Sequence, residues 1–278
     1  MRAGTGFLDV LMRAWRPMAV GLLACGLATG AAADDDAAGL AQKLANPIAD
    51  LISVPFQANY DDDIGPADGW RTQINVQPVI PFSISKDWGV ISRTILPLVD
   101  QDDIAGASGH QSGLGDTTQS LFLSPAQSAD GLTWGVGPVF LLPTATDELL
   151  GTGKWGVGPT GVALVQSGGW TYGMLANQIW SVAGQSGRKD VSSSFLQPFL
   201  VYTTSGATSF ALNTESTYDW NAETWSVPIN LMVSQLFKVG SQPISVQGGL
   251  RYWADSPDAG PEEGGLGFRF NVTFLFPK

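Results

Sequence analysis

A single histidine is the only side chain in the sequence suited to act as the base of a serine-type hydrolase. It is His110, and it lies in the segment Gly109-His110-Gln111-Ser112. A hydrolytic triad needs a base that is held by an orienting partner and lies beside a nucleophile. The glycine and serine residues around His110 instead favour a flexible exterior loop. We therefore interpret it as a solvated histidine and predict no catalytic residues.

Acidic residues gather at three places, which are Asp61-Asp62-Asp63, Asp102-Asp103 and Asp147-Glu148. Carboxylates at this density attract hard cations, and divalent ions bridge anionic groups at a lipopolysaccharide surface. None of the three has the spacing of a Ca²⁺-binding loop, so we interpret them as solvated charge in exterior loops. With one histidine and one cysteine in the chain, the sequence predicts no metal site and no cofactor.

Polar side chains at every second position form the strongest candidate site. Alternate residues of an extended strand share one face. We expect the following set to face the lumen of a barrel and to line a path through it: Arg71, Gln73, Asn75, Gln77, Asn213, Glu215, Gln247, Arg251, Arg269, Asn271 and Thr273. Within this set, Glu215 is expected to pair with Arg251 or Arg269. The alternative is a hydrogen-bonded plug that fills a closed barrel.

Apolar residues occupy the positions between these polar ones. The last predicted strand shows the pattern best, with apolar side chains at Phe268, Phe270, Val272, Phe274 and Phe276. In a soluble sheet the apolar face would cover a core, whereas in a membrane barrel it meets lipid and the polar face lines the lumen. Charged residues make up only 14% of the chain, against about a quarter in soluble domains. This composition favours the barrel.

The first 33 residues are typical of an export signal. Basic residues precede an apolar stretch from Met18 to Leu27, and Ala31-Ala32-Ala33 offers a cleavage site. The apolar stretch is too short for a membrane anchor, which needs about 20 residues. A lipoprotein signal, with Cys25 as the modified residue, is the alternative. We predict a signal peptide at 1–33, a periplasmic segment at 34–50 and an outer-membrane barrel at 51–278.

Cleavage after residue 33 leaves 245 residues without any cysteine. This excludes disulfides and thiol chemistry, and it suits passage through an oxidising periplasm. The leader carries three arginines against one aspartate, so its removal takes the net charge from −11 to −13. Such an acidic chain is not expected to bind nucleic acid.

Twelve segments are predicted as strands: 51–59, 70–80, 88–97, 113–124, 133–143, 154–166, 169–182, 192–202, 207–217, 225–238, 243–253 and 264–276. Most reach the length of about 9–11 residues that crosses a bilayer. Long connections at 60–69, 98–112, 144–153, 183–191, 218–224 and 254–263 alternate with shorter ones at 81–87, 125–132, 167–168, 203–206 and 239–242. Outer-membrane barrels have short periplasmic turns, long exterior loops and an even strand number. Ten or fourteen strands are the alternatives.

Eight tryptophans lie at the ends of predicted strands, where an indole fits the membrane–water interface. Two aromatic girdles are expected, one beside the long loops (Trp70, Trp155, Trp180, Trp225 and Trp253) and one beside the short turns (Trp88, Trp134 and Trp170). Core anchors of a soluble sandwich would lie mostly in mid-strand instead.

Several prolines fall inside predicted strands, among them Pro78, Pro198 and Pro228. Each removes a hydrogen-bond donor from the sheet, so bulges or kinks are expected there. We hypothesise that one of them opens a lateral path through the wall for an apolar substrate.

A series of short motifs runs through nearly the whole mature chain. In order they are Leu44-Ala45-Asn46-Pro47-Ile48, Val54-Pro55-Phe56-Gln57, Asp68-Gly69-Trp70-Arg71, Asn75-Val76-Gln77-Pro78-Val79-Ile80-Pro81, Ser92-Arg93-Thr94-Ile95-Leu96-Pro97, Gly113-Leu114-Gly115-Asp116, Gly135-Val136-Gly137-Pro138, Leu142-Pro143-Thr144-Ala145-Thr146, Arg251-Tyr252-Trp253 and Phe274-Leu275-Phe276-Pro277-Lys278. Together they resemble a family of outer-membrane transporters labelled for the meta-pathway of phenol degradation. The resemblance implies a transport barrel and carries over no catalytic residues.

Two details of the motifs stand out. Outer-membrane chains commonly end on phenylalanine, whereas here Pro277 and Lys278 follow Phe276. The sequence Trp-Gly-Val-Gly-Pro occurs at 134–138 and returns at 155–159. Duplication of a hairpin would explain the repeat, and so would two strands that use the same residues for similar packing.

The sequence therefore predicts an all-β, antiparallel transmembrane barrel in a Gram-negative outer membrane. The expected function is a passive channel or transporter for small molecules, aromatic or otherwise apolar ones among them. Two other functions stay open, which are a structural or adhesion barrel with a packed lumen and an outer-membrane hydrolase. Expected partners are outer-membrane lipid and lipopolysaccharide, the barrel-assembly machinery and a small organic solute.

Overall fold

The computed structural model describes residues 35–127, 131–258 and 260–277, so the predicted export signal at 1–33 lies outside the described residues. Besides helix α2 (Asp35–Leu44) and the short 3-10 helix η1 (Gly65–Ala67), the elements are strands: β1 (Ile52–Ile64), β2 (Gly69–Val76), β3 (Val79–Ser83), β4 (Trp88–Asp102), β5 (His110–Leu114), β6 (Thr117–Pro125), β7 (Leu132–Leu142), β8 (Lys154–Ser167), β9 (Trp170–Gly184), β10 (Ser192–Thr203), β11 (Thr208–Thr214), β12 (Ser216–Asp219), β13 (Thr224–Val239), β14 (Gln242–Asp255) and β15 (Leu266–Phe276). Within these ranges no helix is both long and apolar enough to cross a membrane.

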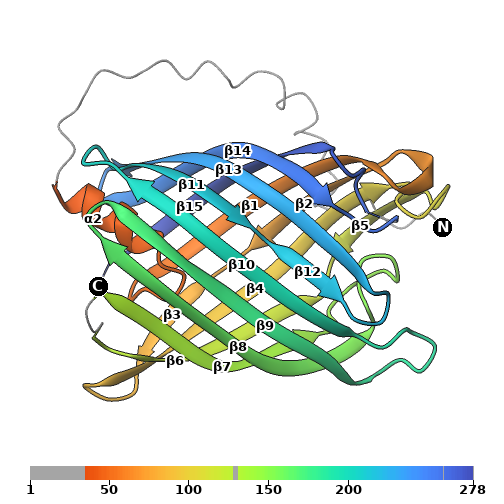
Figure 1. The fold of residues 1–278 in the computed structure, drawn as a ribbon, viewed down its shortest axis with the longest axis horizontal. Coiled ribbons are helices and arrows are strands. Elements are labelled where there is room, and N and C mark those ends of the chain that lie inside the picture. Colours follow the sequence, from red (N-terminus) through yellow and green to blue (C-terminus); the bar gives the residue numbers. More distant parts are fainter. Residues whose placement is uncertain (1–34, 128–130, 259, 278) are drawn as a thin grey trace. The chain divides into compact units, whose positions relative to one another are not determined.

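The strands form one antiparallel sheet that closes on itself (Figure 1). Closure is made where β15 pairs with β1, from Ile52 opposite Phe276 to Tyr60 opposite Phe268. Three of the wall strands are interrupted, so β2 and β3, β5 and β6, and β11 and β12 are successive parts of single strands. The wall therefore has twelve strands. The prediction of a twelve-stranded antiparallel barrel is confirmed.

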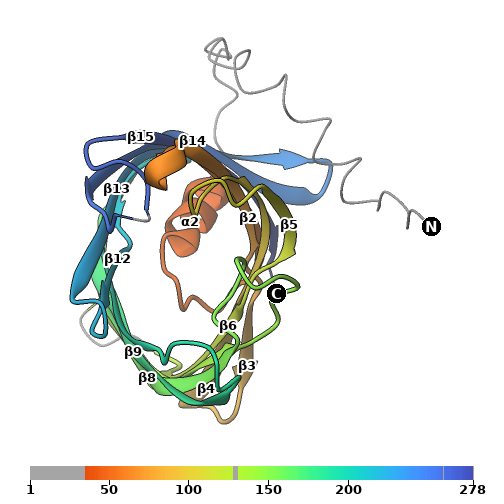
Figure 2. The same ribbon diagram turned by 90° about the vertical axis from the view of Figure 1, so that its right-hand side faces the viewer.

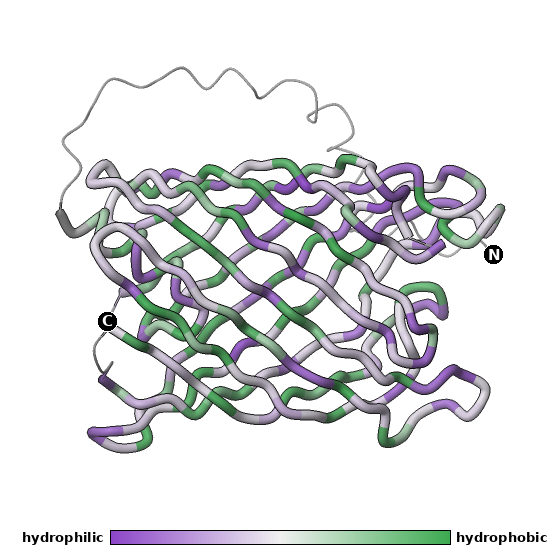
Figure 3. Tube along the Cα trace, viewed as in Figure 1, coloured by the Kyte–Doolittle hydropathy of each residue, from purple (hydrophilic) through white to green (hydrophobic). Residues whose placement is uncertain are grey.

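Hydrophobic and hydrophilic residues are interspersed along the strands of the wall (Figure 3). On β15, Phe268, Phe270 and Phe276 are 43–56% exposed on the outside, whereas Arg269 and Thr273 between them are 2–3% exposed on the inside. Exposed phenylalanines around buried arginine are the reverse of a soluble protein and match a lipid-facing surface. The barrel therefore belongs in the outer membrane.

The connections differ in length between the two ends of the barrel. One end, which we call the loop end, carries 65–68, 103–109, 143–153, 185–191, 220–223 and 256–265; the other, the turn end, carries 84–87, 126–131, 168–169, 204–207 and 240–241. The contrast is weaker than the sequence predicts, because β1 continues to Ile64 and β4 to Asp102. Asp61 gives the reason at β1, since its side chain turns inward and is paired there.

Aromatic side chains surround the outer face near both ends. At the turn end Trp88 stacks edge-on against Trp134 with ring centroids 6.0 Å apart, and at the loop end Tyr218 lies 4.9 Å from Trp225. Six of the eight predicted girdle tryptophans are at least 37% exposed, namely Trp88, Trp134, Trp155, Trp170, Trp180 and Trp225. Trp70 also takes an outward position, next to the inward-facing Arg71.

Trp253 is the exception among the predicted girdle tryptophans. It is 7% exposed, and its indole N–H donates to Asp61. The alternation explains this position, because Trp253 lies two residues after Arg251 and so shares its inward face. Its assignment to a girdle is wrong.

The repeated Trp-Gly-Val-Gly-Pro sequence lies on the adjacent strands β7 and β8, and its two copies meet in the ladder only at their last residues, where Pro138 is opposite Pro159. In each copy the second glycine, Gly137 or Gly158, stands where the neighbouring strand passes very closely. A Cβ atom at either position would collide with a backbone carbonyl oxygen of that strand. The repeat is therefore one local packing solution used on two adjacent strands.

Pro78, Pro198 and Pro228 mark irregular places in the wall. Pro78 separates β2 from β3. Pro198 and Pro228 lie on the strands that flank Glu215, where β11 gives way to β12, and a bulge occurs at Pro228. The carbonyl oxygen of Pro228 accepts the Glu215 N–H at 3.3 Å. The ladder is broken beside the prolines, as the lateral-path hypothesis requires, and that path stays a prediction.

The chain before β1 lies inside the barrel at the turn end (Figure 2). Leu40 and Ala41 of α2 are buried in one apolar cluster with Leu51, Ala207, Leu236 and Leu275. Farther along, Ile48 is buried in a second cluster with Val79, Ile91, Phe122, Val162, Leu164 and Leu175. The sequence predicts a periplasmic segment at 34–50. Its described part instead occupies the mouth of the barrel, where its apolar side chains meet an apolar inner wall.

Leu250→Lys is expected to destabilise the inserted barrel much more than Gln247→Lys. Leu250 faces outward and is 48% exposed, whereas Gln247 faces the lumen from the same strand. A lysine facing the middle of the bilayer costs about 2–4 kcal/mol, and a lysine in the lumen avoids that cost. Urea unfolding in lipid vesicles, followed by tryptophan fluorescence, measures both. Equal losses would contradict the assignment of the two faces.

Candidate functional site

A buried ion pair lies where β11 gives way to β12. The two carboxylate oxygens of Glu215 accept hydrogen bonds from the Arg269 guanidinium at 2.8 and 2.7 Å. Arg269 Nε also donates to Asn59 Oδ1 at 2.7 Å. The planar guanidinium fork matches a carboxylate in geometry and charge. The pair therefore connects β15 and β1 with a wall strand farther round the barrel. Of the two partners predicted for Glu215, Arg251 and Arg269, the structure shows the ion pair with Arg269.

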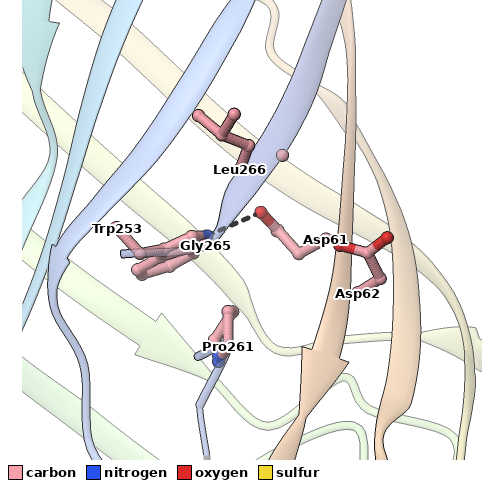
Figure 4. Close-up of a pocket in the computed structure, with 7 residues that line it drawn as sticks. Asp61, Asp62, Trp253, Pro261, Gly265 and Leu266 are labelled. Atoms are coloured by element: carbon pink, nitrogen blue, oxygen red, sulfur yellow. Dashed lines mark hydrogen bonds between the residues drawn. The ribbon is translucent and has the colours of Figure 1, made fainter. Parts of the chain in front are cut away.

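A second arginine contacts a carboxylate nearer the loop end. Asp61 Oδ1 accepts the indole N–H of Trp253 at 2.8 Å (Figure 4), and Asp61 Oδ2 lies 3.6 Å from Arg251. The Arg251 guanidinium lies 4.6 Å from the centroid of the Trp253 ring, which adds a cation–π contact. Asp61 was predicted to be solvated in an exterior loop; this is wrong, because the residue is 7% exposed and faces the lumen.

Two further lumenal arginines contact neutral glutamines. Arg71 Nε donates to Gln101 Oε1 at 2.9 Å, and Arg93 donates to Gln77 Oε1 at 3.3 Å. Gln101 in turn donates to Gln111 and to the carbonyl oxygen of Leu149, both at 3.2 Å. These side chains therefore join the polar layer of the lumen to loop 143–153.

All eleven predicted lumen residues occupy inward-facing positions of their strands, and two contacts connect members of the set. Besides the Glu215 pair, Gln73 donates to Asn75 at 2.9 Å. Asn213 is joined to the set through its neighbour Asn230, which donates to it at 2.8 Å. Gln247, Asn271 and Thr273 share the inner faces of β14 and β15 with the arginines.

Several lumen residues were not predicted: Asn59, Asp61, Arg93, Gln101, Gln111 and Trp253. Arg93 was missed because the positions two residues before and after it, on the same inward face, are isoleucines. The alternation of polar and apolar residues is lost where the lumen itself is apolar. Asp61, Gln101 and Gln111 lie in segments that the sequence predicts as loops, and Asn59 is the last residue of the predicted strand 51–59.

The loop end is held together by hydrogen bonds between connections. The Asp116 carboxylate accepts the backbone N–H of Ala145 at 3.2 Å and that of Thr152 at 2.6 Å. Arg188 donates to the carbonyl oxygens of Glu148 and Thr152. These contacts fix loop 143–153 against the interruption between β5 and β6.

An ion pair between a buried lysine and an exposed aspartate adds to these contacts. Lys154 Nζ lies 2.9 Å from Asp190 Oδ1. This hydrogen bond and the lysine charge lower the pKa of Asp190 below its ordinary value. Loop 185–191 is thereby attached to the start of β8.

His110 is the first residue of β5 and lies at the loop end on the outer face. Its Nε2 lies 2.6 Å from Asp100 Oδ1 on β4, and the two side chains are 46% and 14% exposed. The expectation of a flexible loop is therefore wrong for His110, because it is in a paired strand and has a carboxylate partner. Ser112, two residues on, shares its face and lies opposite Asp100 in the ladder.

The acidic clusters were also considered as cation sites. In the part of the chain that the structure describes, no group of three or more histidine, cysteine, aspartate or glutamate side chains is arranged to hold a metal ion. Asp147 instead accepts the backbone N–H of Leu149 at 2.8 Å within its loop. Its role there is to shape the turn.

Comparison with known proteins agrees with this architecture. The fold is similar to the crystal structure of an outer-membrane channel from Pseudomonas putida F1, with a TM-score of 0.63 and 16% identity over 81% of this chain and 95% of that chain. More distant similarities are to the NanC porin (TM-score 0.49, 11% identity, 80% and 98% coverage) and to outer membrane phospholipase A from Escherichia coli (0.47, 10%, 81% and 90%). No protein-family model and no curated protein matches the sequence. At these identities the likeness establishes the fold.

Glu215→Gln is expected to lower the free energy of unfolding by about 3 kcal/mol, because it leaves the buried Arg269 without a charged partner. The matched control is Glu223→Gln, which makes the same change in the exposed connection 220–223 and is expected to have little effect. Urea unfolding of the refolded barrel measures both. The double variant Glu215→Gln/Arg269→Gln should recover part of the lost stability. Equal stability of Glu215→Gln and the control Glu223→Gln would contradict the importance of the ion pair.

Proposed function

We propose that this protein is a passive outer-membrane channel for small molecules. The observation that carries the proposal is a set of buried polar atoms in the lumen without a protein partner. Among the described residues they include Arg251 Nε, Asn230 Oδ1 and Asn271 Oδ1. Leaving such an atom dry costs about 1–3 kcal/mol. Three of them in one lumen favour water or solute there over a packed core. The fold shared with an outer-membrane channel supports the same function.

The cargo that we propose is a small solute with an apolar or aromatic body. The family resemblance implies such cargo, and the lumen offers apolar surface beside its polar layer. Phe195 and Phe199 are half-buried on the inner face and pack against the cluster around Phe122. These rings would contact an apolar solute, while the arginines and amides next to them would contact its polar groups.

The surroundings of the barrel follow from its two ends. In the proposed orientation the turn end faces the periplasm and the loop end faces the lipopolysaccharide, as in other outer-membrane barrels. Lipid would cover the apolar outer face between the aromatic belts. Insertion would use the barrel-assembly machinery.

A barrel with a packed lumen and a purely structural role is the competing function, and the N-terminal segment inside the lumen supports it. Leu40→Asp separates the two. Leu40 is 6% exposed between α2 and the wall, so a carboxylate there is costly unless the helix leaves. We expect single-channel conductance in planar bilayers to rise above that of the unaltered protein.

Gly39→Asp is the matched control for this measurement. It adds the same charge one residue away, at an exposed position where a side chain meets no other atom. Its conductance should equal that of the unaltered protein. Absence of any conductance from the unaltered protein and both variants would reject the channel in favour of the packed barrel.

The contact between Asp100 and His110 supports a second candidate function, hydrolysis of lipid esters at the outer face. In such a reaction Ser112 Oγ would attack the ester carbonyl carbon while His110 takes its proton and returns it to the departing alcohol. Water would then release the acid from the serine by the reverse proton transfers. Asp100 would hold the imidazole in place, the role of the third member of a triad.

For this second candidate we expect covalent labelling by a fluorophosphonate probe in detergent micelles, lost in Ser112→Ala and retained in Ser108→Ala. Ser108 is a suitable control because it lies in the adjoining connection 103–109. Hydrolysis of a p-nitrophenyl ester should show the same pattern, with activity lost in Ser112→Ala and retained in Ser108→Ala. A protein that conducts ions but is neither labelled nor active on the ester would remove this candidate and leave the channel in place.

A further inference from the structure

Four arginines face the lumen, and they differ in their partners. Arg269 contacts Glu215, and Arg251 contacts Asp61. Arg71 and Arg93 hydrogen-bond only to glutamines among the described residues. Asp61 lies opposite Arg71 in the β1–β2 ladder, but its carboxylate is already engaged by Trp253 and Arg251. These six charged groups leave an excess of two positive charges inside a chain whose net charge is −11.

Arg71 and Arg93 also keep most of their hydrogen-bonding capacity. A guanidinium carries five N–H donors, and each of these two makes one hydrogen bond to a described protein group. A charged group removed from bulk water is stabilised by a counter-charge and by hydrogen bonds to its remaining donors. Neutral glutamines supply no counter-charge. The carboxylates whose charge acts on Arg71 and Arg93 are Asp61 and Glu215, and each of them is already paired with another arginine. An anion from outside the chain would supply the missing charge and the hydrogen bonds.

Apolar side chains lie next to Arg93 on the inner wall. Val79 is its partner in the β3–β4 ladder, and Ile91 lies two residues away on the same face. Both belong to the buried cluster around Phe122, against which Phe195 and Phe199 pack from β10. A guanidinium beside aliphatic and aromatic surface suits an anion that carries an apolar body.

We propose that Arg93 binds the carboxylate of a small organic acid, whose apolar body contacts the wall around Ile91 and Phe199. Arg71 lies opposite Gln101, eight residues farther along β4, and adds positive charge to the path nearer the loop end. The inference rests on the proposed channel function and names its substrate class. The planar carboxylate matches the fork of a guanidinium. The arginines thereby make the channel selective for organic anions over cations and over neutral analogues of the same size.

The acidic residues at the loop end act against this preference, and screening limits their effect. Asp62, Asp63 and Glu148 are exposed to solvent. At physiological salt the Debye length is about 8 Å, so exposed charges act weakly beyond their own loops. The lumenal arginines are enclosed by the wall, where screening is much weaker. The sign of the lumen therefore decides the selectivity.

The test uses the mature protein in planar bilayers, with reversal potentials in potassium chloride gradients and with potassium benzoate as the probe. We expect the unaltered protein to be anion-selective. The benzoate concentration that halves the chloride current should rise at least about tenfold in Arg71→Gln/Arg93→Gln, because the variant loses one charged hydrogen bond or more. Lys86→Gln is the matched control, because it removes the same charge from the exposed turn 84–87. Its selectivity and inhibition should be unchanged.

A conservative variant and two other solutes separate the outcomes. Arg93→Lys keeps the charge but loses the planar guanidinium, so it should retain anion selectivity and bind benzoate more weakly. Heat-modifiable migration on gels shows that each variant is folded. Benzyl alcohol should not inhibit, and inorganic phosphate should inhibit less than benzoate. Equal effects of phosphate and benzoate, cation selectivity, or an unchanged double variant would each overturn the inference while the channel stands. Absence of conductance would instead overturn the channel function on which it rests.

Discussion

The backbone of a chain within a bilayer must satisfy its own hydrogen bonds, because lipid offers no water to do so. The pairing of β15 with β1 meets this constraint by closing the sheet. Every strand then has one face toward lipid and one toward the lumen, and the side chains divide accordingly: Phe270 lies outside and Arg269, next to it, lies inside. The polar lumen is thus a consequence of closure, since positions that alternate with lipid-facing residues are the ones where polar groups can be placed.

One of the interruptions of the wall coincides with the buried ion pair of the lumen. Glu215 lies between β11 and β12, flanked by strands that carry Pro198 and Pro228. Prolines supply no N–H to their neighbours, so the ladder beside Glu215 loses donors, while the Glu215 N–H still reaches the Pro228 carbonyl oxygen. The carboxylate itself is held by Arg269. A side-chain ion pair therefore connects Glu215 to β15 at a place where backbone pairing is interrupted.

The sequence predicts the strands whose two faces differ most, and it fails where they do not. On β15, phenylalanine and polar residues alternate strictly, and the structure agrees. Acidic residues at the end of β1 and the glycine-rich approach to His110 suggested loops, because local composition does not show that Asp61 meets Arg251 or that His110 meets Asp100. Arg93 was hidden for the opposite reason, as its inward neighbours are apolar. Contacts between distant segments decide these residues.

The lumen changes character from one end to the other. At the turn end α2 packs its few apolar side chains against the wall, and the Gln42 side chain donates to the carbonyl oxygen of Gly168. A ten-residue helix is unstable by itself in water, so α2 depends on these contacts for its structure. Burying one side chain such as Leu40 contributes only about 1.5–3 kcal/mol, whereas separating Arg269 from Glu215 would cost more. Several apolar side chains hold the helix in this way, so a carboxylate in place of Leu40 would remove one share of that free energy and would also oppose the burial of the helix.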